Sequence, residues 1–82
     1  FSDITESMVR IYNMKNHDYG NSFDRSLDEH GPIAAIVRME DKLNRLKTLN
    51  NCKKAEVNES IRDTLIDLAN YAVMTALWFE KQ

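Results

Sequence analysis

The chain has 82 residues, a formal net charge of -2 and 43% hydrophobic residues. This length corresponds to one domain, residues 1–82, which buries about 60% of the surface that its unfolded chain exposes. The slight negative charge gives no reason to expect nucleic-acid binding or attraction to an anionic membrane. No signal peptide is visible, and the apolar run 65–79 is too short, and interrupted by Asp67, for a membrane span. The single Cys52 cannot form an internal disulfide, so we expect a reduced, cytoplasmic protein.

The pattern of the chain predicts an all-α fold. Only two Gly and one Pro occur, and no segment alternates strictly between apolar and polar residues. Gly31 can close a short helix, Pro32 suits the first turn of the next one, and Asn58 can cap the last. Periodicity and these signals predict four helices, at 3–16, 23–29, 32–49 and 59–79. Short connections favour an antiparallel four-helix bundle in which one helix is short.

The last predicted helix carries acidic residues within an apolar surface. One of its faces bears Ile61, Leu65, Leu68, Ala72, Ala76 and Phe79, and the opposite face bears Glu59, Asp63, Asp67 and Asn70. A helix that is apolar in nearly every direction is central in a bundle or dimer. A buried ionised carboxylate such as that of Asp67 costs several kcal/mol unless it is paired or coordinated. We therefore expect a cation at Asp67, Asp63 and Glu59, either a divalent metal or an Arg or Lys of a neighbouring helix.

The third predicted helix adds a further inward acid. Its predicted inner face consists of Ile33, Ile36, Val37, Glu40, Leu43, Asn44 and Lys47. Adjacent helices lie about 8–10 Å apart, so inward Glu40 could share an ion with Asp63 and Asp67. Carboxylates are ligands that Mg²⁺ or Mn²⁺ prefers, and no His or Cys lies on these faces, which argues against zinc. Basic residues that could meet the phosphates of a nucleotide lie nearby, at Lys15, Lys42, Arg45 and Lys47.

Simpler interpretations stand beside the metal site. Inward acids form buried ion pairs with basic side chains at least as readily as they bind metals. Glu59 and Asp63 lie in the first turns of their helix, where the helix dipole favours acids in any case. Tyr19, Tyr71 and Trp78 could stack on a base, but aromatic residues at helical spacing usually belong to a core.

Three segments carry a resemblance to a known family. KNHDYGNSF at 15–23, RMEDKLNRL at 38–46 and ESIRDTLIDLANYA at 59–72 resemble the blocks of the nucleotide modification-associated domain of phages and bacteria. They are similar, more distantly, to the MazG-like and dimeric dUTPase group of all-α nucleoside triphosphate pyrophosphohydrolases. In that group an ExxE and a later ExxD on consecutive helices bind Mg²⁺, and the helices assemble into dimers or tetramers. Here Leu43 stands where the second Glu of the ExxE would be.

The residue pattern and the resemblance together give a functional hypothesis. The chain is expected to be an oligomeric, Mg²⁺- or Mn²⁺-dependent nucleotide-binding domain that hydrolyses a (deoxy)nucleoside triphosphate to the monophosphate and pyrophosphate. The expected metal ligands are Glu40, Asp63 and Asp67, with Glu59 as a fourth ligand or as the base that orients water. The expected nucleotide contacts are Lys15, Lys42 and Arg45 to phosphates, and Asp18, Tyr19 and Asn70 to sugar or base.

The alternative hypothesis is a non-catalytic helical module that binds a nucleotide or a protein. In it, Glu40, Asp63 and Asp67 pair with Arg38, Lys42 or Arg45 in a structural network. The incomplete ExxE favours this alternative.

Overall fold

The computed structural model describes residues 1–15, 22–52 and 55–82. These residues form four helices and no strand, which confirms the all-α prediction. The helices are α1 (Ser2–Met14), α2 (Asp24–His30), α3 (Ile33–Asn50) and α4 (Ala55–Glu80). None of them is long and apolar enough to cross a membrane.

The helix ends differ from the predicted ones in two places. The final helix begins at Ala55, so Asn58 lies inside its first turn and does not cap it, because the preceding Ala and Glu are strong helix formers. The first helix ends at Met14, and the part of its predicted range beyond Lys15 lies outside the described residues. Gly31 closes α2 with φ 77° and ψ -163°, a backbone conformation that is essentially confined to glycine.

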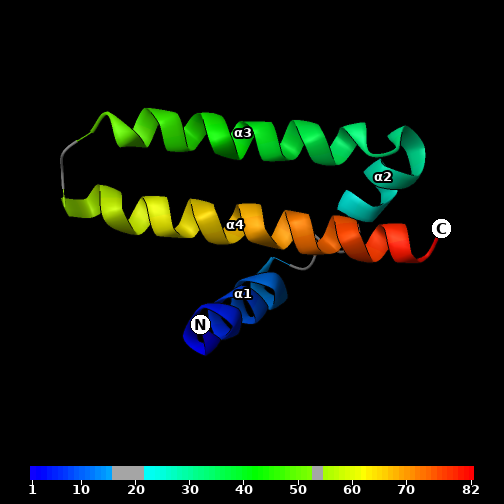
Figure 1. Ribbon diagram of the computed structural model, residues 1–82, viewed down its shortest axis with the longest axis horizontal. Helices are drawn as coiled ribbons and strands as arrows, with labels where there is room; N and C mark the ends of the chain where they lie inside the picture. Colours follow the sequence, from blue (N-terminus) through cyan, green and yellow to red (C-terminus); the bar gives the residue numbers. More distant parts are fainter. Residues whose placement is uncertain (16–21, 53–54) are drawn as a thin grey trace.

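Helix α4 is the centre of the molecule, as its apolar surface predicts. It runs beside α3 along the length of that helix, and the two are antiparallel (Figure 1). Helix α1 packs against a different side of α4 and crosses it at an angle, while α2 folds back at the end of α3 that lies near the C-terminus. The observed bundle is therefore an α3/α4 hairpin with α1 and α2 attached to it.

The core lies at the α2 end of this hairpin. Phe23 and Leu27 are fully buried there, and Ala35, Tyr71 and Met74 complete the cluster. The rings of Phe23 and Tyr71 meet edge to face, with centroids 5.0 Å apart, a favourable arrangement for aromatic pairs. Because Ala35 is small, α3 can approach these rings closely.

The prediction of which face of α3 packs inward is wrong. All seven of its residues are exposed, namely Ile33, Ile36, Val37, Glu40, Leu43, Asn44 and Lys47. The side toward α4 instead carries Ala35, Arg38, Met39, Lys42, Leu46 and Leu49, which are buried or half-buried. Aliphatic residues occur on more than one side of α3, so periodicity alone could not select the face that packs. As a consequence, Glu40 points to solvent and not into the bundle.

Candidate functional site

The most buried charged residue in the described part of the chain is Asp67, whose side chain is 11% exposed. Lys15, at the end of α1, donates from Nζ to both carboxylate oxygens at 3.2 Å. Lys42 of α3 donates from Nζ to Oδ2 at 3.1 Å. The carboxylate thus links α4 to both neighbouring helices, and the prediction that a cation meets Asp67 is confirmed.

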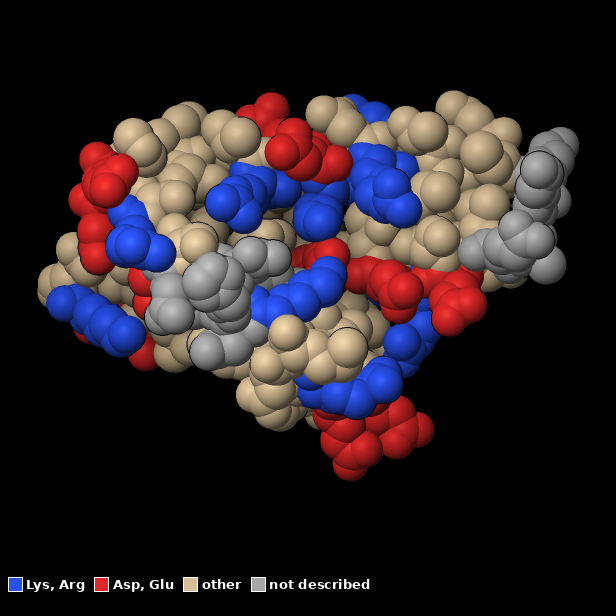
Figure 2. Space-filling view, turned by 180° about the vertical axis from the view of Figure 1, so that it is seen from behind, with Lys and Arg blue, Asp and Glu red and all other residues tan. Residues whose placement is uncertain are grey.

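Lys42 belongs to a row of three basic residues on α3 that face polar groups of α4. Arg38 donates from Nη1 to the hydroxyl of Tyr71 at 3.2 Å, and Arg45 donates from Nε to the hydroxyl of Thr64 at 3.3 Å. These residues follow one another at spacings of four and three, which places them on one side of the helix. Figure 2 shows Lys and Arg side chains along this helix and acidic side chains between it and α1.

The guanidinium of Arg38 also lies over two aromatic rings. Its Cζ is 5.9 Å from the centroid of Phe23 and 5.8 Å from that of Tyr71, within the range of cation–π attraction. Arg38 therefore connects the row of basic residues to the aromatic core, and these contacts hold its side chain in place.

A hollow of about 310 Å³ opens beside Asp67, between α1 and α4. Its walls are Arg10, Ile11, Met14 and Lys15 from α1 and Glu59, Asp63 and Asp67 from α4. The acids follow one another at one-turn spacing along α4, as predicted, so they share one wall. Asp63 and Glu59 are exposed, in contrast to Asp67. The hollow therefore combines both signs of charge with a buried carboxylate at one end.

The predicted metal ligands are not all brought together. Asp63 and Asp67 line the same hollow, but Glu40 is exposed on the side of α3 that faces away from α4. Within the described residues, no three His, Cys, Asp or Glu side chains form a group placed to hold a metal ion. The described donors therefore do not form the predicted ion site of Glu40, Asp63 and Asp67 together.

The remaining predicted contacts fall elsewhere. Asn70 is buried and donates from Nδ2 to the carbonyl oxygen of Met8 at 3.2 Å, so its amide holds α1 against α4. It also lines a second hollow, of about 380 Å³, whose other walls are almost entirely apolar. Asp18 and Tyr19 lie outside the described residues.

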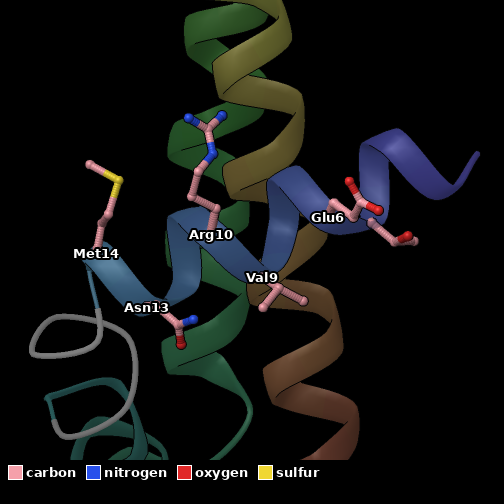
Figure 3. Close-up of a pocket in the computed structure, with 6 residues that line it drawn as sticks. Glu6, Val9, Arg10, Asn13 and Met14 are labelled. Carbon is pink, nitrogen blue, oxygen red and sulfur yellow. The ribbon is translucent and has the colours of Figure 1, made fainter.

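A third hollow, on the outer side of α1, is formed by that helix alone. Figure 3 shows its side chains spread along the helix, with Arg10 and Met14 projecting from one side and Val9 and Asn13 from the other. No second element contributes to it. A surface built from one helix does not enclose a ligand, so this hollow is a weaker candidate than the one beside Asp67.

Comparison with known proteins places the chain in a family. A model of the family described as nucleotide modification associated domain 1 matches residues 15–78. The chain belongs to this family. No curated protein and no solved structure matches it.

In this nucleotide modification associated domain, the match begins at Lys15 and extends through most of α4. It therefore includes Asp67 and the two lysines bound to it. Sequence reasoning did not identify Thr64 or Tyr71 as the partners of Arg45 and Arg38. The spacing of Arg38, Lys42 and Arg45 could have indicated these partners, because it places three basic residues on one side of α3. That side is an alternative to the aliphatic side as the one that packs against α4.

Proposed function

We propose that this domain binds the phosphates of a (deoxy)nucleotide between α1, α3 and α4, and that it hydrolyses a nucleoside triphosphate to the monophosphate and pyrophosphate. The observation that carries the proposal is the buried carboxylate of Asp67, bridged by Lys15 and Lys42 at the end of an acid-lined hollow. Family membership supports a nucleotide as the ligand.

The phosphates would be bound by basic side chains of α1 and α3 that contact polar groups of α4 in the structure. Lys15 and Lys42 are 48% and 27% exposed, so an incoming anion can reach both ammonium groups. Arg45 lies one turn from Lys42 and presents a guanidinium, which matches phosphate geometry with two parallel donors. A triphosphate would compete with Asp67 for the two lysines. Phosphate oxygens would then replace the carboxylate as the anionic partner of the ammonium groups.

The carboxylates suit an ion that enters with the nucleotide. Mg²⁺ is usually bound through one or two carboxylates together with substrate phosphates. Asp63 and Asp67, one turn apart in the same hollow, supply such a pair, whereas Glu40 does not take part. When bound, the ion would offset phosphate charge and promote attack by water.

Hydrolysis needs a group that takes a proton from the attacking water. In the proposed reaction the water oxygen bonds to the α-phosphorus, the bond from that phosphorus to the bridging oxygen breaks, and pyrophosphate leaves. Glu59 is the proton acceptor in this proposal, because it lines the same hollow and its exposure leaves it accessible to water.

A second candidate is a module that binds without catalysis. The observation that favours it is the pairing of both oxygens of Asp67 with ammonium groups, which gives this carboxylate a structural role. In that case Asp67 stays paired with Lys15 and Lys42, and the nucleotide, or a protein, binds without being cleaved.

The test is a screen of unmodified and modified deoxynucleotides with Mg²⁺, in which binding is followed by calorimetry and pyrophosphate release is measured separately. A nucleotide that binds should lose about tenfold or more in affinity when Lys42 is replaced by Gln, because a charge-assisted contact to phosphate is removed. Asp63→Asn should abolish pyrophosphate release and leave the fold intact.

Lys47→Gln is the matched control, because Lys47 lies on the opposite side of α3 from Lys42. It should bind the nucleotide like the unmodified chain. Binding without pyrophosphate release from any nucleotide would establish the second candidate. No binding to any member of the panel would refute both nucleotide proposals.

A further inference from the structure

Two ammonium groups share one carboxylate oxygen at Asp67. Lys15 Nζ lies 3.2 Å from both oxygens, and Lys42 Nζ lies 3.1 Å from Oδ2. The two lysines therefore converge on Oδ2 from different helices, Lys15 from the end of α1 and Lys42 from α3. Together the three side chains carry an excess of positive charge. The carboxylate takes up the space between the two ammonium groups, where a bound anion would be held.

A phosphate group fits the same pair of donors. It presents several acceptor oxygens, and ammonium groups donate to phosphate and to carboxylate at similar distances. Both lysines are more exposed than the side chain of Asp67. An anion that arrives from solvent can therefore reach the ammonium groups and replace the carboxylate as their partner.

The packing of α1 on α4 does not depend on these ion pairs alone. Asn70 donates from Nδ2 to the carbonyl oxygen of Met8 at 3.2 Å. Arg62 donates from Nη2 to the hydroxyl of Ser7 at 3.1 Å. Both hydrogen bonds join the two helices, so Lys15 can change its partner while α1 stays on α4.

We propose that Asp67 is an internal competitor of the ligand phosphate. Its carboxylate binds Lys15 and Lys42 in the ligand-free chain, and a phosphate group has to displace it in order to bind. The inference rests on the proposed nucleotide site and deepens it, because the displacement lowers the affinity of that site for every anion by the same factor. Only an anion that makes further contacts is then retained.

Arg45 supplies the further contact for a chain of linked phosphates. It lies one turn from Lys42, about 4.5 Å further along the helix axis. Its side chain is exposed, and its Nε donates to the hydroxyl of Thr64, a neutral acceptor, which leaves the other guanidinium donors for phosphate. A triphosphate can contact this arginine as well as the lysines. A monophosphate makes fewer contacts, so the returning carboxylate of Asp67 displaces it more readily.

The test is calorimetric titration of the complete chain with inorganic triphosphate, in EDTA so that no divalent ion contributes. Asp67→Asn should bind triphosphate about tenfold or more tightly than the unmodified chain, because the competing negative charge is removed. Adding Lys42→Gln to Asp67→Asn should abolish most of this gain. Circular dichroism at the titration temperature checks that each variant is folded.

Glu40→Gln is the matched control, because it removes the same charge from an exposed position on the side of α3 that faces away from α4. It should change the affinity for triphosphate by less than about threefold, since salt screens a charge at that distance. An equal gain from Glu40→Gln and Asp67→Asn would overturn the inference, because the effect would then be one of net charge.

A second measurement uses the unmodified chain and does not depend on the folding of any variant. Carbon-detected NMR should show a shift of the Asp67 carboxylate resonance when triphosphate saturates the chain, as the lysines leave it. If triphosphate binds but this resonance stays in place, or if folded Asp67→Asn binds no more tightly, the inference is wrong and the nucleotide site stands. If triphosphate binds to none of the chains, the inference and the proposed site both fail.

Discussion

At the scale of single residues, Asp67 shows how a buried charge is accommodated. Its two oxygens accept three hydrogen bonds from two lysines that are 52 and 25 positions away in the sequence. Hydrogen bonds to charged groups contribute about 1.5–3 kcal/mol. Because Lys15 is about half exposed, water screens part of this attraction, and the lower part of that range applies to it.

Asp67→Asn should therefore lower the free energy of unfolding by about 1–3 kcal/mol, because it removes the negative charge between two ammonium groups. The measurement is urea denaturation of the nucleotide-free chain at low ionic strength. Asp63→Asn is the control, one turn away but exposed, and should change stability by less than about 0.5 kcal/mol. Equal effects of the two substitutions would contradict the structural role of Asp67.

At the scale of the helix, α3 has two sides that could have packed against α4. One is aliphatic, with Ile36, Val37 and Leu43, and the other combines Ala35 and Met39 with basic residues. The second side packs, because small Ala35 admits the rings of Phe23 and Tyr71 and because the basic residues find polar partners on α4. The first side stays exposed.

Ala35→Leu tests this orientation of α3. Ala35 is 1% exposed and lies within the core cluster, so the larger side chain should overpack it and destabilise the chain by about 1–3 kcal/mol. Thermal unfolding checks this. Thr48→Leu, on an exposed part of α3, should stay within about 0.5 kcal/mol. An Ala35 variant as stable as the unmodified chain would place a different face of α3 inward.

At the scale of the whole molecule, charged and apolar side chains are unevenly distributed over the hairpin of α3 and α4. The side that carries Asp67 and α1 is charged (Figure 2), whereas Ile36 and Leu43 of α3 and Leu65 of α4 are exposed elsewhere on the hairpin. The proposed nucleotide site uses only the charged side of these helices.

The sequence by itself determined the helical class and the existence of a buried carboxylate that needs a cation. Both follow from local properties, namely helical periodicity, the scarcity of Gly and Pro, and the cost of an unpaired charge among apolar residues. It also marked α4 as the central helix, since that helix is apolar on nearly every side.

Only the tertiary structure decided which side of α3 packs and which cations meet Asp67. The aliphatic and basic sides of α3 are both consistent with helical spacing, so the choice depended on the shape and polar groups that α2 and α4 present to it. The pairing of Lys15 with Asp67 likewise requires α1 to cross α4, a contact between segments 52 residues apart. Spacing within one helix contains no information about such a contact, because it is set by the packing of whole helices.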